Sequence, residues 1–228
     1  MSSRKVIARK AQRNAAPQAQ AATPFQAGWN EDNIPDLPHM TPQGLALLEL
    51  ELERSRIYLE YGSGGSSILA VRKGVRKIYS VDSDAGFLKA VHAKIKTMGA
   101  RRGSYVPLFA DIGPTKAWGR PADESKATLW PQYISAPWDA MRKKGHQPDL
   151  VLIDGRFRVA SFLMTAMLAS PGCVILFDDY FDRPYYHVIE RHFQPVEKAG
   201  RLAKFVINTF DRPDLALIDL MAYCTTYD

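Results

Sequence analysis

The stretch from Arg56 to Asp84 constrains the fold more than any other part of the sequence, because its pattern changes three times in a short distance. It contains, in order, a β-branched and aromatic run at Arg56–Leu59, glycines at 62, 64 and 65, helical spacing at Ser66–Arg72 ended by Gly74, and a second apolar run at Lys77–Val81. Two short apolar runs joined by one helix predict a βαβ unit, whose strands are parallel.

An acid stands directly after the second run. Asp82 follows Gly62 by twenty residues, where a carboxylate can accept hydrogen bonds from the hydroxyls of a ribose. The pattern therefore predicts a nucleoside cofactor. A dinucleotide is disfavoured, because the third glycine of G-x-G-x-x-G is missing and Glu60 would repel a pyrophosphate. A nucleotide-dependent oxidoreductase is disfavoured for the same reasons.

The E-Y-G-S-G stretch at 60–64, followed by Asp82, resembles the first two motifs of class I S-adenosylmethionine-dependent methyltransferases. The resemblance implies that Gly62, Ser63 and Gly64 flank the cofactor, that Glu60 lies near its amino group, and that Asp82 holds the ribose. The alternative is a glycine-rich turn of the kind found in any α/β protein.

The rest of the chain continues the alternation of strands and helices. We expect one α/β domain at 31–228, a Rossmann-like methyltransferase fold with a mostly parallel seven-stranded sheet, a C-terminal antiparallel hairpin and helices on both faces. The expected helices are Thr41–Glu53, Asp84–Met98, Val159–Leu168 and Tyr185–Phe193. The further expected strands are Tyr105–Ala110, Asp149–Ile153 and Cys173–Phe177, with Lys204–Ile207 and Leu215–Tyr223 as the antiparallel pair.

Asp111 ends the third expected strand. In the methyltransferase family an acid there often binds the adenine amino group, so the resemblance implies this role for Asp111. Equally, Asp111 could cap the turn before Ile112-Gly113-Pro114.

Three further carboxylates follow adjacent strands, in VLIDGRFR at 151–158 and VILFDDY at 174–180. Asp154, Asp178 and Asp179 could therefore converge on one divalent cation. The arrangement resembles metal-dependent O-methyltransferases of the catechol and macrocin types. That resemblance implies that the three aspartates bind Mg²⁺, and that the metal acidifies a substrate hydroxyl. Asp154 is the residue that we expect to be catalytic.

One position departs from the macrocin-type pattern. Where those enzymes can carry a second acid as general base, this chain has Arg156, which cannot accept a proton. Either Arg156, with Arg158 close behind it, orients an acidic substrate through planar, two-pronged contacts, or the metal site is vestigial. In a purely structural alternative, Asp178 and Asp179 cap a helix and Arg156 pairs with one of them.

The segment 112–138 is longer than a usual α/β connection and contains Trp118, Trp130, Trp138 and Tyr133. Such a segment is typical of a lid or of the wall of a substrate site. The alternative is that these aromatic residues pack the loop onto the domain surface.

The positive charge is concentrated near the start of the chain. Residues 1–30 hold five basic residues and no acid, whereas the whole chain carries +6, so residues 31–228 carry only +1. We therefore expect a disordered basic tail at 1–30, or alternatively an organellar transit segment, and no nucleic-acid-binding domain. No apolar run is long enough to span a bilayer, and two cysteines fit a reducing, cytoplasmic location.

Two functions from different classes follow from these patterns. The first is methyl transfer from S-adenosylmethionine to an oxygen of a small, acidic molecule, with Mg²⁺ as a further cofactor if the three aspartates bind it. The second is a methyltransferase-like binding or regulatory protein that keeps the cofactor site but has no turnover.

Overall fold

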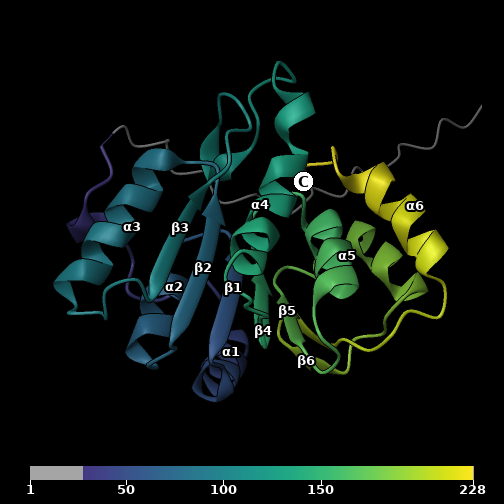
Figure 1. Ribbon diagram of the computed structural model, residues 1–228, viewed down its shortest axis with the longest axis horizontal. Coiled ribbons are helices and arrows are strands. Elements are labelled where there is room, and N and C mark those ends of the chain that lie inside the picture. The colour runs from purple at the N-terminus through teal and green to yellow at the C-terminus, as the bar shows by residue number, and fades with distance from the viewer. Residues whose placement is uncertain (1–27, 228) are drawn as a thin grey trace, which may run out of the picture.

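The computed structural model describes residues 28–227 and contains one seven-stranded sheet (Figure 1). The strand order is β3-β2-β1-β4-β5-β7-β6. The strands are β1 (Ile57–Tyr61), β2 (Lys77–Asp82), β3 (Tyr105–Phe109), β4 (Leu150–Ile153), β5 (Val174–Phe177), β6 (Glu197–Ala199) and β7 (Leu202–Val206). Strands β1 to β5 are parallel, while β7 runs antiparallel to both β5 and β6. The predicted sheet, mostly parallel with a terminal antiparallel pair, is confirmed.

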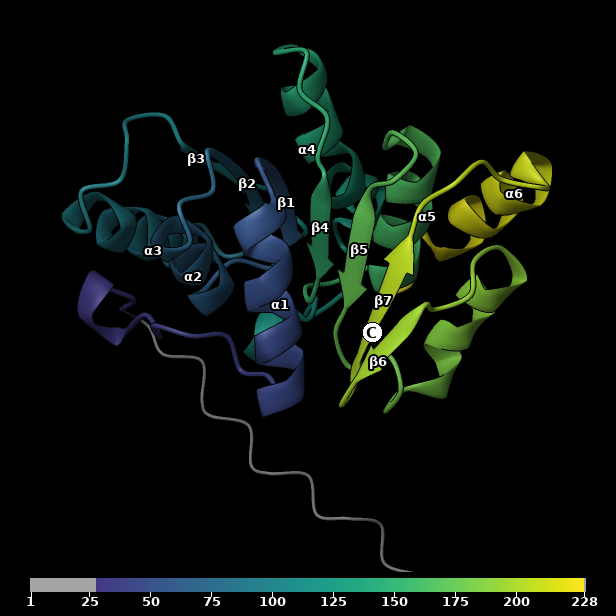
Figure 2. The ribbon, with the colours of Figure 1, turned by 90° about the horizontal axis from the view of Figure 1, so that it is seen from below.

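Helices cover both faces of the sheet (Figure 2). One face carries α1 (Pro42–Arg54), α2 (Gly65–Arg72) and α3 (Ala85–Thr97), and the other carries α4 (Pro131–Arg142), α5 (Arg158–Leu168) and α6 (Pro213–Tyr223). Short 3₁₀ helices lie at Glu31–Asn33, Ala117–Gly119, Ala127–Leu129 and Pro184–Arg191. Each helix layer packs its own apolar cluster against the sheet.

The strands bury both faces because their side chains alternate. In β1, Leu59 and Tyr61 enter the cluster beneath α4 and α5, whereas Tyr58 enters the cluster beneath α1 to α3. All three side chains are fully buried. Continuous apolar strands of this kind are expected in parallel sheets that helices cover on both sides.

The predicted strand at Leu215–Tyr223 is wrong, since these residues form α6, and the strand that pairs with β7 is β6. The run is apolar at nearly every position, so its pattern does not separate a strand from a helix. Pro213 and Asp214 in the first turn are typical of a helix N-terminus and were the available signal. The helix expected at Tyr185–Phe193 is a 3₁₀ helix at Pro184–Arg191.

The expected substrate loop at 112–138 is helical in its last part, because α4 begins at Pro131. Trp130, Tyr133 and Trp138 are buried in the core, with 2%, 1% and 7% of their surface exposed. These three aromatic residues therefore pack the segment onto the domain. Trp118 is 68% exposed, and the role of the segment 112–138 as a substrate loop or lid stays a prediction.

The folded part starts earlier than residue 31. The Trp29 Nε1–H donates to Asp84 Oδ2 at 3.2 Å, and its ring packs edge-on against Phe87 with centroids 4.8 Å apart. Trp29 and Asn30 thus belong to the domain, and Gly28 is also described, whereas residues 1–27 of the predicted basic tail lie outside the described residues. Within 28–227, no helix is both long and apolar enough to cross a membrane.

Candidate functional site

The carboxyl edge of the parallel strands gathers most of the predicted site residues. Parallel strands end at one edge, so the acids that follow β1 to β5 are brought into one row. Successive turns are joined by backbone hydrogen bonds. The Gly62 N–H donates to Val81 O at 2.9 Å, and the Asp154 N–H donates to Tyr61 O at 3.0 Å.

The glycine turn after β1 needs glycine for two different reasons. Gly62 and Gly64 have φ angles of +99° and +144°, which L side chains rarely adopt. A Cβ on Gly62 would also lie 2.9 Å from the backbone nitrogen of Gly155, so the turn after β1 touches the turn after β4. The glycines therefore allow a close backbone contact in the middle of the candidate site.

Glu60 lies beneath this turn and is fully buried. Its Oε2 accepts hydrogen bonds from Ser66 Oγ at 2.6 Å and Tyr58 Oη at 3.1 Å, and its Oε1 accepts one from Ser67 Oγ. Burial raises the pKa of Glu60 to about 7, although the hydroxyl donors oppose the rise. These contacts attach Glu60 to the first turn of α2. The implied contact with a cofactor amino group stays a prediction.

Asp82 holds the glycine turn from the end of β2. Its Oδ2 accepts from the Ser63 N–H at 2.9 Å, and its Oδ1 accepts from the Asp84 N–H at 3.0 Å. Burial raises the pKa of Asp82 to about 6 against the effect of these backbone donors. Each carboxylate oxygen can accept a second hydrogen bond. Asp82 is therefore positioned beside Ser63 with acceptor capacity left for a pair of hydroxyls, which fits a ribose.

Two aromatic rings stand beside the same turn and were missed in the sequence. A Cβ built on Gly64 would lie 3.4 Å from Cζ of Phe87, and Trp29 packs edge-on against Phe87 with ring centroids 4.8 Å apart. Trp29 lies in the stretch interpreted as a tail. An aromatic residue in a basic, Ala-rich segment was the available signal.

Asp111 adopts the turn-capping arrangement. Its Oδ1 accepts from the Gly113 N–H at 3.1 Å, and its Oδ2 pairs with Lys126. The side chain is 42% exposed, so the turn cap leaves it accessible at the edge. A contact between Asp111 and adenine stays a prediction.

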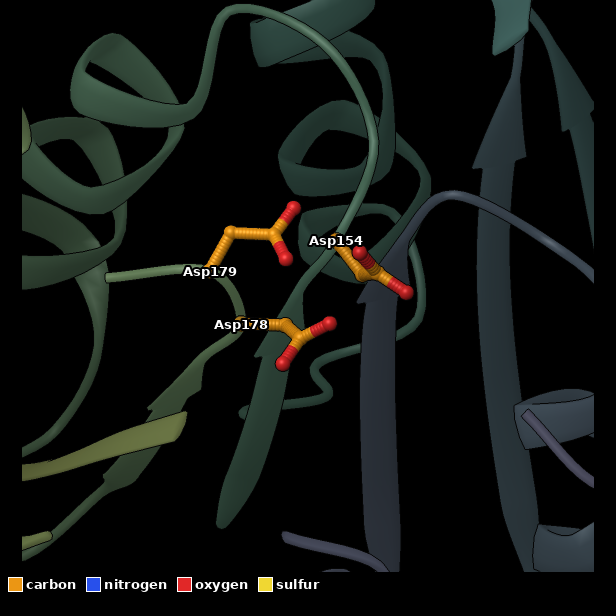
Figure 3. Close-up of side chains that lie close together, drawn as sticks. All are labelled: Asp154, Asp178 and Asp179. Atoms are coloured by element: carbon orange, nitrogen blue, oxygen red, sulfur yellow. The ribbon is translucent and has the colours of Figure 1, made fainter. Parts of the chain in front are cut away.

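Asp154, Asp178 and Asp179 converge as the sequence predicts. One oxygen from each carboxylate lies within 4.8 Å of the others, and Figure 3 shows Asp178 and Asp179 reaching toward Asp154. We call these three residues the acid cluster. Asp178 is buried, with 1% of its side chain exposed, whereas 14% of Asp179 and 30% of Asp154 remain exposed.

Three arginines pair with the acid cluster. Arg158, 3% exposed, lies 3.1 Å from both Asp154 Oδ1 and Asp179 Oδ2, and it also donates to the backbone oxygens of Asp154, Gly155 and Asp178. Arg183 pairs with Asp179 at 2.8 Å. Arg201 pairs with Asp178 and with Asp179, at 2.9 Å each.

These contacts decide whether the cluster suits a divalent cation. Three guanidiniums balance three carboxylates, and Arg158 bridges two of the acids. A divalent cation would have to displace these hydrogen bonds and remain close to buried positive charge, where Coulomb repulsion is large. The residues present therefore do not fit a resident Mg²⁺.

The pKa of Asp154 is raised within the acid cluster. Burial raises its pKa, Arg158 opposes the rise, and the neighbouring Asp178 and Asp179 add to it. Arg156 lies two residues away, is 7% exposed, and its backbone N–H donates to Tyr133 Oη at 3.3 Å. The ion pairs described above come from Arg158, Arg183 and Arg201, none of which the sequence assigned to the aspartates.

Comparison with solved structures finds similar proteins at different levels of sequence identity. A methyltransferase-like protein from Silicibacter pomeroyi is 32% identical, with 84% of this chain and 99% of that chain covered and a TM-score of 0.72. An O-methyltransferase from Bacillus cereus in complex with SAH is 15% identical, covers 78% and 86% of the two chains, and has a TM-score of 0.50.

An O-methyltransferase from Streptomyces achromogenes involved in tomaymycin synthesis, in complex with SAM, is 18% identical, covers 78% and 85%, and has a TM-score of 0.50. At these identities the two O-methyltransferases show a common fold alone. No protein-family model and no curated protein matches the chain.

Proposed function

The chain belongs to the class I S-adenosylmethionine-dependent methyltransferase superfamily, and from this premise we propose that it transfers a methyl group from S-adenosylmethionine to an oxygen of a small, acidic molecule. The observation that carries the proposal is the position of Asp82. Its carboxylate is fixed beside the glycine turn by two backbone N–H groups and keeps acceptor capacity for two hydroxyls.

In this proposal the cofactor lies along the turn formed by Gly62, Ser63 and Gly64, with its ribose on Asp82 and its adenine near Asp111. S-adenosylmethionine supplies an electrophilic methyl group carried on a positively charged sulfur. Acids along the carboxyl edge suit that charge and would repel a pyrophosphate. Glu60 supports the glycine turn, because its carboxylate accepts a hydrogen bond from Ser66 at the start of α2.

Asp154 accepts the proton of the substrate hydroxyl. The raised pKa makes its carboxylate a stronger base than an ordinary aspartate, and 30% exposure leaves the side chain accessible. Arg156 contributes positive charge two residues away, which favours a substrate with a carboxylate or a phosphate. We expect transfer to proceed without Mg²⁺, because arginines already neutralise the acid cluster.

A second function is favoured by the same arginines. If Arg158 and Arg201 serve only to pair the cluster, the chain binds the cofactor without turnover and acts as a binding or regulatory protein. Release of S-adenosylhomocysteine in the presence of candidate phenols and hydroxy acids separates the two functions.

Calorimetric titration with S-adenosylmethionine, S-adenosylhomocysteine and NAD⁺, with and without Mg²⁺, tests the cofactor. We expect binding of the first two and not of NAD⁺. Asp82→Ala should weaken that binding by at least about tenfold, because it removes two charge-assisted hydrogen bonds. Asp139→Ala, which removes an exposed acid on α4, is the matched control and should leave the affinity unchanged. Equal affinity in both variants would refute the assignment.

Turnover is tested on Asp154→Asn and in chelator. The variant should lose most of its turnover and keep its affinity for S-adenosylmethionine, while wild-type turnover should be the same in EDTA as in Mg²⁺. Loss of wild-type turnover in EDTA, restored by Mg²⁺, would show that the acid cluster binds the metal after all.

A further inference from the structure

A basic hollow lies at the amino edge of the sheet, opposite the edge that carries the candidate site. It has a volume of about 430 Å³ and is lined by residues at or just before the starts of β1, β2, β3 and β4. The lining includes five cationic side chains, namely Arg56, Arg76, Lys77, Arg101 and Arg102, together with His146. We call these five residues the basic pocket.

The sheet topology explains why these residues meet. Strands β1, β2 and β3 are parallel neighbours, so their preceding loops emerge at one edge (Figure 1). The Lys77 N–H donates to Arg56 O at 3.1 Å, and the Ile78 N–H donates to Ser104 O at 2.7 Å. These backbone contacts hold the loop bearing Arg101 and Arg102 against the starts of β1 and β2.

The positive charges of the basic pocket are poorly compensated within the described residues. Across 28–227, no ion pair joins any of its four guanidiniums to a carboxylate. The neighbouring Asp149 accepts from the backbone N–H groups of Arg56 at 2.9 Å and Ile57 at 3.2 Å. Burial lowers the pKa of Lys77, and the positive charge of Lys144 lowers it further.

We propose that the basic pocket binds a small anion that carries two or more phosphate groups. Arginine forks match phosphate oxygens in pairs, and four of them around one hollow exceed the need of a single phosphate. A volume of about 430 Å³ is of the size that holds a small molecule. The proposal does not depend on the chemistry of the opposite edge.

The charge distribution favours a small ligand over a nucleic acid. Residues 31–228 carry +1 in total, so the domain outside the five pocket cations carries −4. A nucleic acid needs a basic surface that extends along its backbone, whereas the net charge of the domain outside the five pocket cations is negative. A compact polyanion needs only the five cations of the basic pocket.

Calorimetric titration of the full chain with inorganic tripolyphosphate and with ATP, at low and at physiological ionic strength, tests the proposal. We expect one binding site in each case. Similar affinities for the two probes would show that the basic pocket recognises the phosphates alone. Tighter binding of ATP would show that it also contacts the nucleoside. Either result supports the site. Absence of binding to both probes at low ionic strength would overturn it.

Paired charge-removal variants locate the site. Arg76→Ala/Arg101→Ala should weaken tripolyphosphate binding by at least about tenfold, since it removes two forks. Lys89→Ala/Lys198→Ala removes the same charge from exposed positions elsewhere and should change the affinity less than about twofold. Equal losses in both pairs would show a general charge effect and overturn the proposal. Tighter binding of a single-stranded RNA than of tripolyphosphate, abolished by the pocket pair, would also overturn it in favour of a nucleic-acid site.

Discussion

Replacing Arg201 by methionine tests whether arginine neutralisation is what stabilises the acid cluster. Arg201 donates to both oxygens of Asp178, at 3.1 Å from Nε to Oδ1 and 2.9 Å from Nη2 to Oδ2, and it pairs with Asp179 at 2.9 Å. Among the described residues, the ion pairs of Asp178 come from Arg201 alone. Methionine keeps much of the length of the side chain while removing its charge.

The magnitude follows from burial. Asp178 is 1% exposed, so its carboxylate would lose its ion-pair partner while shielded from water, with Arg158 held nearby only through the Asp178 backbone oxygen. Breaking a buried pair in this way costs about 3–5 kcal/mol of unfolding free energy. An exposed pair is worth about 0–1 kcal/mol, and Arg191→Met, which breaks the pair between a 68% exposed arginine and Asp219, supplies that control.

Urea unfolding followed by tryptophan fluorescence measures these differences, since Trp130 and Trp138 are buried. The double variant Arg201→Met/Asp178→Asn removes the stranded charge as well, so it should recover at least about 2 kcal/mol relative to additivity. Arg201→Lys keeps one positive charge and should fall between wild type and Arg201→Met.

Two results would refute the reasoning. One is a loss below about 1 kcal/mol in Arg201→Met, comparable to the Arg191→Met control. The other is strict additivity of Arg201→Met and Asp178→Asn, because independent sites do not share a buried charge.

Three further predictions concern pH, packing and the N-terminus. The pKa of Glu60 is raised from its ordinary 4.5 to about 7, so the folded state binds the proton more tightly than the unfolded state and stability falls as pH rises. Relative to Glu60→Gln, the unfolding free energy of the wild type should fall by about 3 kcal/mol between pH 4.5 and pH 8. A difference that does not change with pH would contradict this. Gly155→Ala places a Cβ 2.1 Å from Tyr133 Oη, which should cost about 1–3 kcal/mol in urea unfolding, and Tyr133→Phe should recover part of that cost; an unchanged midpoint would show that the turn relaxes freely. Deletion of residues 1–27 should leave the melting temperature and S-adenosylmethionine affinity unchanged, and a fall of many degrees would show that this segment docks on the domain.

The parts of the fold that the sequence predicts are those with local signals. The glycines at 62 and 64 and the acid at 82 define the first βαβ unit, and the apolar runs at 150–153 and 174–177 are bounded by turns and acids. The position of Asp82 beside Ser63 follows from parallel strands alone. The strand predicted at Leu215–Tyr223 was wrong because a run that is apolar at nearly every position has no informative period.

The chemistry of the acid cluster was only half predictable. Convergence of Asp154, Asp178 and Asp179 follows from the ends of adjacent strands. The partner that neutralises Asp178 comes from a hairpin 23 residues further along the chain, and no local pattern marks that arginine. The contact of Trp29 with the domain was not predicted for a related reason, since its partner Asp84 is 55 residues away in the chain.

The contacts of Arg201 also bear on how late in synthesis the domain can finish folding. Besides Asp178, it donates to His39 O, which is 162 residues away in the chain. Strand β7 follows it directly and covers the open side of β5. A nascent chain that has emerged only as far as β5 therefore lacks the cation for Asp178 and exposes an unpaired strand edge. Ribosomal synthesis must pass residue 206 before the acid cluster, β5 and the segment around His39 are fixed together.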